Sequence, residues 1–262
     1  FGCLKDEKFC DKMKDAVLFK NLDHKYLTLK DCIEANGGTV ENPNAKTEET
    51  KADDQNAENK EEDKTIIYYV SDEIQQSQYI NMFKNQGMDA VILGHNIDSP
   101  FITQLEQRNQ NIKFQRIDAD VTEGAKEEVA EDEKEAFQKT SDSLVEIFRK
   151  ELGNENLDVK IEKLKDEKVA SMMTLSEENR RMQEMMKMYG MSGMDMGTTS
   201  TLILNANHPL VQYVVEHKDS ENTSIICKQL YDLAMLAHKP LSPEEMTAFV
   251  QRSNEIMMLL TK

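Results

Sequence analysis

Three short segments have the pattern of buried β-strands: TIIYYV at residues 65–70, AVIL at 90–93 and KFQRI at 113–117. TIIYYV and AVIL show no alternation of polar and apolar residues, as expected of strands that are covered on both faces. Helical patterns separate the segments, from about Asp72 to Gln86 and near Pro100 to Gln107. Strands and helices that alternate at this spacing are joined by right-handed crossovers. The stretch therefore predicts a small three-stranded parallel αβα domain.

The residues before this domain divide into a helical part and an acidic part. Residues 1–36 are predicted to be helical, and Thr28 starts a last turn of helix from Leu29 to Ala35. From Glu41 to Lys64 the chain has nine acidic residues, four Lys and no large apolar side chain. Such a composition cannot bury enough surface to offset the entropy of ordering it, so we predict a flexible loop.

The second half of the chain mixes helices and strands. Glu123 to Leu152 is acidic at first and then periodic, which predicts a connecting helix. Val159–Leu164 and Val169–Met173 are predicted to pair as strands. The remaining elements are a helix from Ser176 to Tyr189, a strand from Thr201 to Leu204, and helices from His208 to the end. The expected fold class is α+β with an α/β part, ending in a helical bundle.

We divide the chain into five parts on these patterns. They are a helical part at 1–40, the acidic loop at 41–64, the αβα domain at 65–120, an acidic connecting segment at 121–140, and the mixed α/β domain at 141–262. The chain begins at Phe1 in the middle of a helical pattern, so we interpret it as part of a longer protein.

The charge of the chain limits its partners. Its 49 acidic and 32 basic residues give a formal net charge of −17, which repels phosphate backbones and anionic membranes. The longest uninterrupted apolar runs, such as Ile256 to Leu260, are far shorter than the roughly 20 residues of a membrane-spanning helix. We therefore expect a soluble, cytoplasmic protein that binds neither nucleic acid nor membranes.

No motif for catalysis or metal binding stands out. The four cysteines, Cys3, Cys10, Cys32 and Cys227, have no C-x-x-C spacing, and the five His residues are far apart. The chain has no G-x-x-x-x-G-K, G-x-G-x-x-G or G-x-S-x-G sequence that would bind phosphate or activate a serine. We therefore expect no disulfide framework, no metal site and no enzyme activity in this chain.

Methionines are concentrated in one part of the sequence. The chain has 16 Met residues, and Met182, Met185, Met186 and Tyr189 follow the spacing of one helical face. Core packing is one interpretation, and an adaptable binding surface is another, because flexible Met side chains repack against different partners. Met191 and Met194 continue the pattern into a glycine-rich stretch. A third interpretation is thioether coordination of Cu(I).

Two amphipathic helices are predicted at the end of the chain. Ser242-Pro243-Glu244-Glu245 combines an N-cap Ser, a Pro at the first helical position and the Glu of a capping box. Apolar residues form stripes on this helix and on the one before it. The helices could pack on their own domain or form half of an intermolecular bundle.

Three stretches carry a resemblance to a known family. They are KTIIYYVSDEIQQSQYINMFKNQGMDAVILGHNIDSPFITQLE at 64–106, RRMQEMMKMYGMSGMDMG at 180–197 and TLILNANHPLVQYVV at 201–215. In combination and in this order they resemble the bacterial ninety-kilodalton heat-shock chaperones. The resemblance extends over nearly the whole chain from about Leu18.

The resemblance implies a division of labour along a longer protein. The family consists of an amino-terminal ATPase domain, a middle domain and a carboxy-terminal dimerisation domain. By this match the chain holds the end of the middle domain and the whole dimerisation domain. ATP and Mg would bind in the upstream domain, so the chain itself is expected to have no cofactor and no ATPase activity.

The resemblance also implies two functional surfaces. The first would bind partly folded client proteins through Met182, Met185, Met186, Tyr189, Met191, Met194 and Phe101. The family usually has an acidic and an aromatic residue where this chain has Ser99-Pro100, and Phe101 lies one place later. The second surface would hold a homodimer together through Ile226, Leu230, Leu233, Phe249, Val250, Ile256, Met257 and Leu260. The alternative function is that of a cytosolic Met-rich Cu(I)-binding protein.

Overall fold

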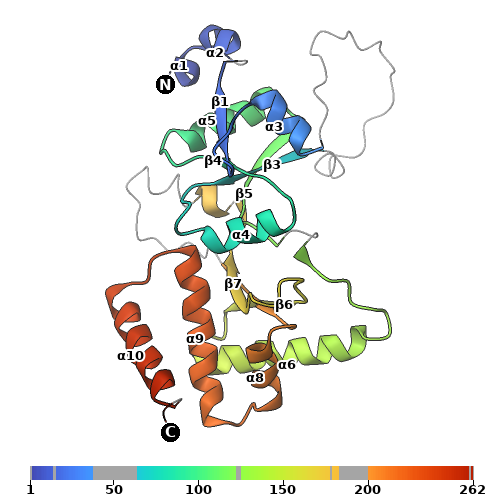
Figure 1. The fold of residues 1–262 in the computed structure, drawn as a ribbon, viewed down its shortest axis with the longest axis vertical. Helices are drawn as coiled ribbons and strands as arrows, with labels where there is room; N and C mark the ends of the chain where they lie inside the picture. The colour runs from blue at the N-terminus through green and yellow to red at the C-terminus, as the bar shows by residue number, and fades with distance from the viewer. Residues whose placement is uncertain are drawn as a thin grey trace. The chain divides into compact units, whose positions relative to one another are not determined.

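The structure, a computed structural model, describes residues 2–13, 16–37, 64–121, 125–177, 179–182, 200–259 and 261 (Figure 1). The chain forms two compact units. Unit 1 comprises Phe1–Ile74 and Phe83–Ile117, and unit 2 comprises Gln75–Met82 and Asp118–Lys262. All but the last residue of the acidic loop predicted at 41–64 lies outside the described residues.

Unit 1 contains a five-stranded mixed sheet. Its strands are β1 (Leu18–Asn21), β2 (Tyr26–Thr28), β3 (Thr65–Val70), β4 (Val91–Ile92) and β5 (Ile112–Arg116), in the order β2-β1-β4-β3-β5. As predicted from the sequence, β3 runs parallel to both β4 and β5. The sheet is larger than predicted, because β1 adds antiparallel to β4 and forms a hairpin with β2.

The β1–β2 hairpin corrects the prediction of a helix through residues 1–36. The turn is built around Asn21, whose Oδ1 accepts hydrogen bonds from the backbone N–H groups of Asp23 and Lys25. His24 takes the left-handed backbone conformation that such a turn requires, with φ of 61°. The local turn chemistry therefore overrides the apolar spacing that favoured a helix.

The helices of unit 1 are α1 (Gly2–Lys5), α2 (Glu7–Met13), α3 (Leu29–Ala35), the end of α4 (Ser77–Asn85) and α5 (Asp98–Arg108). The helix predicted after Thr28 is confirmed, and Thr28 and Asp31 form a capping box at its start. α4 begins later than the predicted Asp72, since Asp72 Oδ1 accepts a hydrogen bond from the N–H of Ile74 and holds a turn there. The core of the unit consists of Phe19, Cys32, Ile33, Ile67, Tyr69, Val91, Ile102, Leu105, Ile112 and Phe114.

Unit 2 contains a three-stranded sheet that corrects the predicted strand pairing. β6 (Asp158–Glu162), β7 (Ser171–Thr174) and β8 (Thr201–Asn205) lie in the order β6-β8-β7, so the first two do not pair with each other. β8 is parallel to β6 and antiparallel to β7. Asn205 of β8 binds both ends of the connection between β6 and β7. Its Oδ1 accepts a hydrogen bond from the N–H of Leu164, and its Nδ2 donates one to the carbonyl of Val169.

The described part of unit 2 also contains the helices α6 (Lys134–Leu152), α8 (Pro209–Glu216), α9 (Glu221–His238) and α10 (Pro243–Leu259), which are labelled in Figure 1. The prediction that the chain is almost entirely helical after His208 is confirmed. α9 packs on β7, α6 and α8 and so forms the centre of the unit. The buried core is Leu144, Phe148, Leu157, Val159, Ile161, Met173, Leu202, Leu204, Val211, Val214, Cys227, Leu230, Ala234 and Met235.

Candidate functional site

The last helix, α10, has no buried residue. Its start is the predicted capping box, in which Glu245 N–H donates to Ser242 Oγ and Ser242 N–H donates to a Glu245 carboxylate oxygen at 2.8 Å. These hydrogen bonds from the backbone and side chain of Ser242 lower the pKa of Glu245. The cap therefore fixes where the helix begins without any help from burial.

Polar contacts join α10 to α9. Arg252 Nη1 lies 2.6 Å from Asp232 Oδ2, and Gln229 Nε2 donates to Ser253 Oγ at 3.2 Å. Phe249 and Ile256 are half-buried on α10. Since these contacts fix the rotation of the helix, the sides that remain exposed are also fixed.

One exposed side of α10 is apolar. Met246, Val250 and Met257 are 38%, 50% and 55% exposed, and their spacing of four and seven residues puts them on one side of the helix. We call these three residues the α10 stripe. Met258 and Leu259 are also exposed near the end of the helix. Figure 1 shows α10 as the outer helix of the pair that it forms with α9.

The predicted interface residues of α9 have different surroundings. Leu230 is 1% exposed and belongs to the core of unit 2, and Ile226 packs partly against that core. Leu233 is 46% exposed. Leu233 is therefore the residue of the three that α9 offers most openly to a partner. The structure brings Phe249, Val250, Ile256 and Met257 together on α10, and Leu260 lies outside the described residues.

A buried ion-pair cluster precedes the methionine-rich segment. Glu177 is 7% and Arg180 4% exposed, and Glu177 pairs with Arg180 and also with Arg181, whose Nε lies 2.8 Å from Glu177 Oε1. Burial alone would raise the pKa of Glu177, but the hydrogen bonds and charges of the two arginines outweigh it and lower that pKa. Residues 179–182 are helical, so the cluster anchors the turn that carries Met182.

The predicted client-binding residues are only partly described. Met182, in the anchored turn, is 40% exposed. Met185, Met186, Tyr189, Met191 and Met194 lie outside the described residues. Phe101 is half-buried and packs against the core of unit 1. Two methionines just before this segment, Met172 and Met173, are core residues of β7 with 1% exposure.

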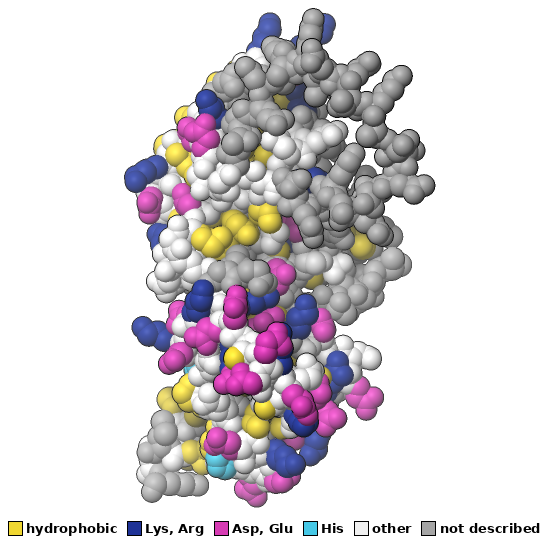
Figure 2. Space-filling view, turned by 90° about the vertical axis from the view of Figure 1, so that its right-hand side faces the viewer, with side chains coloured by type: hydrophobic (Ala, Val, Ile, Leu, Met, Phe, Trp, Pro, Cys, Tyr) yellow, Lys and Arg dark blue, Asp and Glu magenta, His cyan; other side chains and the backbone are white. Residues whose placement is uncertain are grey.

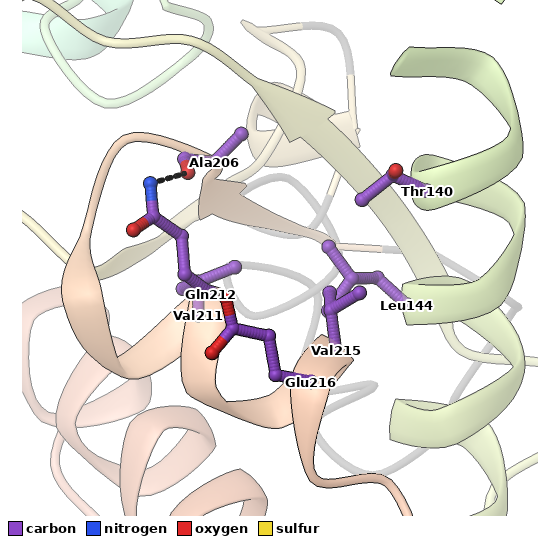
Figure 3. A pocket seen from close by; sticks show the side chains of 7 residues that line it. All are labelled: Thr140, Leu144, Ala206, Val211, Gln212, Val215 and Glu216. Atoms are coloured by element: carbon purple, nitrogen blue, oxygen red, sulfur yellow. Dashed lines mark hydrogen bonds between the residues drawn. The ribbon is translucent and has the colours of Figure 1, made fainter. Parts of the chain in front are cut away.

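A small pocket lies between α6 and α8 in unit 2, and it was not indicated by any sequence motif (Figure 3). It has a volume of about 130 Å³ and is lined by Thr140, Leu144, Ala206, Val211, Gln212, Val215 and Glu216. Gln212 Nε2 donates to the carbonyl of Ala206 at 3.1 Å. The walls are mostly aliphatic, and the polar groups of the lining are Thr140, Gln212 and Glu216.

Two other features bear on chemistry. Asp118 and His238 form a buried pair in unit 2, with Asp118 Oδ2 3.3 Å from His238 Nδ1. The sequence did not indicate this pair, because the two residues are far apart in the chain. Within the described ranges, no three His, Cys, Asp or Glu side chains converge to hold a metal ion.

None of the helices described is both long and apolar enough to cross a bilayer. On the face of unit 2 in Figure 2, acidic and basic side chains are interspersed.

Comparison with known proteins connects these surfaces to a family. Residues 41–262 match the family model described as "Hsp90 protein". The chain is 28% identical over 238 residues to the "Chaperone protein htpG" of Bacteroides fragilis strain 638R, a match that covers 86% of this chain and 31% of that protein. It is 27% identical over 239 residues to the corresponding protein of Porphyromonas gingivalis strain W83, with 86% and 31% covered. It is also 25% identical over 236 residues to that of Bacteroides thetaiotaomicron, with 84% and 30% covered.

These relatives set the scale of the chain, which spans about a third of their length. The family model covers well over half of the chain. The chain therefore belongs to the Hsp90 protein family.

Proposed function

We propose that this chain is the homodimerisation and client-binding part of an ATP-dependent chaperone that assists protein folding under stress in the cytoplasm. Its membership of the Hsp90 family and its likeness to proteins named chaperones support this role. ATP and Mg would bind in a domain of the longer protein. The partners of the chain would be a second copy of itself and partly folded proteins.

The α10 stripe is the observation that carries the proposal. Three apolar side chains on one face of a terminal helix remain exposed after the helix has packed on α9. Fully burying an exposed Val or Met side chain contributes about 1.5–3 kcal/mol. These side chains are about half exposed, so each would contribute roughly 0.7–1.5 kcal/mol, and a symmetric interface would bury each of them twice. Pairing the α9 and α10 helices of two copies would form a four-helix bundle with the stripe in its core.

Leu233, Phe249 and Ile256 would extend this interface. Leu233 is exposed, and the other two are half-buried, so each keeps some apolar surface for a second copy. Ile226 and Leu260 complete the proposed set. Leu230 is left out because the core of its own unit already surrounds it.

Client binding is proposed for the methionine-rich segment. Met182 projects from a turn that Glu177 and Arg180 hold in place, while remaining 40% exposed. Met185, Met186, Tyr189, Met191 and Met194 would continue this apolar surface. Long, unbranched thioether side chains adapt to unrelated sequences, which suits a surface that meets many clients. Phe101 would contribute only the part of its ring that the core of unit 1 leaves exposed.

The proposed client role is tested with a Met182→Gln, Met186→Gln double variant. An exposed binding surface should tolerate both changes with a loss of stability within about 1 kcal/mol, because exposed substitutions usually change it by less than about 0.5 kcal/mol each. Affinity for an unfolded model protein should fall at least about tenfold, the equivalent of 1.4 kcal/mol. A matched control is Thr247→Gln on α10, which is exposed and lies outside the proposed client surface. Unchanged affinity with a large fall in melting temperature would return these methionines to the core.

A further inference from the structure

Packing holds the walls of the pocket between α6 and α8 in place. Leu144 and Val211 are each 1% exposed and belong to the core of unit 2. The His208 side chain caps the start of α8, and Gln212 on the same helix donates a hydrogen bond to the carbonyl of Ala206. The pocket is therefore formed in the absence of any ligand, so binding would require little reordering of its walls.

The size of the pocket suits one apolar side chain. Its volume is about 130 Å³. An apolar cavity of about 150 Å³ is large enough for benzene, so a Leu or Met side chain would fit here. The two smallest side chains of the lining, Thr140 and Ala206, leave this space, and Figure 3 shows them on different elements around it.

The charge of the pocket selects for a cation beside the apolar group. Glu216 is the charged residue of the lining. It is exposed, and no cation among the described residues pairs with its carboxylate. The net charge of −17 also attracts cations over a longer range. A ligand that combines an apolar side chain with a nearby positive charge therefore matches both the shape and the charge of the pocket.

We propose that the pocket between α6 and α8 binds extended segments of partly folded proteins in which an apolar side chain lies two residues from a Lys or Arg. In an extended chain, side chains two residues apart point to the same side. The apolar side chain would enter the pocket while the cation meets Glu216. This proposal rests on the client-binding role and gives it a second contact, made by residues outside the methionine-rich segment.

Methyl NMR of the full chain, labelled at Leu and Val, tests the proposal with synthetic peptides. Millimolar SLSKS, blocked at both ends, should shift the methyl signals of Leu144, Val211 and Val215 but not those of Val250 on α10. SLSES should bind at least about threefold more weakly, because Glu216 repels its charge. SGSKS, which has no apolar side chain, should cause no shift at the same concentration. No shift with SLSKS, or equal binding of SLSES, would overturn the proposal.

A first pair of variants tests the shape of the pocket. Thr140→Met should fill the pocket and weaken SLSKS binding at least about tenfold, the loss expected when a Leu side chain no longer has an apolar site. Gln138→Met places the same side chain at an exposed position of α6 outside the lining, so it should leave binding unchanged. Equal binding by the Thr140→Met variant and the unaltered chain would place the peptide elsewhere and overturn the proposal.

A second pair tests the charge. Glu216→Lys should abolish the preference for SLSKS over SLSES. Glu146→Lys makes the same change of charge at an exposed position of α6 outside the lining, and it should keep that preference. If both variants lost the preference equally, the net charge and not Glu216 would be responsible, and the role assigned to Glu216 would be overturned.

The affinity of the same chain for an unfolded model protein, measured in parallel, separates this proposal from the client-binding role. Unfolded-protein binding that depends on Met182 and Met186, without any peptide shift at the pocket, would overturn the pocket proposal and leave the role intact. Peptide binding in the pocket of a chain that binds no unfolded protein would support the ligand class of the pocket and contradict the role.

Discussion

Replacing Glu177 with Gln should destabilise unit 2 strongly. Glu177 is 7% exposed, and it pairs with Arg180, which is 4% exposed, and with Arg181. Removing one partner of a buried ion pair typically costs 3–5 kcal/mol, because the remaining charge stays desolvated. Gln keeps one oxygen that can accept a hydrogen bond, so we expect about 3 kcal/mol, the lower end of that range.

The assay is urea unfolding of the full chain followed by circular dichroism, with Glu135→Gln as the matched control. Glu135 pairs with Lys139 at 2.8 Å, but their side chains are 85% and 74% exposed. Exposed pairs of this kind contribute about 0.3–0.5 kcal/mol, so the control should change stability very little. The reasoning would be refuted if the two variants lost the same small amount.

The effect of Glu177 should also depend on pH. The folded chain lowers the pKa of Glu177 from its ordinary value of 4.5, so the carboxylate stabilises the fold fully above about pH 4.5. That stabilisation is lost as pH falls through the folded-state pKa. The difference between the unaltered chain and Glu177→Gln should therefore be constant near neutrality and narrow in acid. A difference that grew toward low pH would contradict the assigned direction of the shift.

Three further predictions follow from the site and the fold. Calorimetry of the chain with ATP and Mg should show no micromolar binding, because no phosphate-binding motif occurs in the sequence. A micromolar affinity would contradict the proposal that ATP binds in another domain of the longer protein. Met182→Leu with Met186→Leu should keep client affinity within about twofold, since Leu and Met are alike in apolar surface; loss of stoichiometric Cu(I) uptake in this variant would instead favour the copper-binding alternative. Asn205→Ala should lower the free energy of unfolding in urea by at least about 2 kcal/mol, because it leaves the buried N–H of Leu164 and the carbonyl of Val169 without this partner. A loss below about 0.5 kcal/mol would refute the role given to Asn205.

Much of the fold could be predicted because its signals are local. The unbroken apolar run of β3 and the capping motifs at Thr28 and Ser242 each act within a few residues. The central position of β8 could not be predicted, because it depends on contacts between residues far apart in the sequence. Asn205, for example, holds Leu164 from 41 residues away.

The candidate site shows the same limit. The sequence indicates that Leu230 and Leu233 are both apolar and both helical, but not which one faces the core. Packing of α9 on β7 decides this, and Ser171 of β7 donates to the carbonyl of Leu230 at 2.7 Å. The same holds for α10: the sequence shows which of its residues are apolar, but not that Phe249 and Ile256 are half-buried while Met246, Val250 and Met257 stay exposed.

Sedimentation equilibrium of the chain tests the central claim most directly. The unaltered chain, of 30.1 kDa, should sediment at twice that mass at micromolar concentration. Val250→Asp with Met257→Asp should raise the dissociation constant at least about hundredfold, since the interface then loses two half-exposed apolar side chains from each copy, which together contribute about 3 kcal/mol. Ala248→Asp adds a charge to an exposed position away from the α10 stripe and should leave the dimer intact. A monomeric unaltered chain, or a double variant that dimerises as tightly as Ala248→Asp, would contradict self-association through α10.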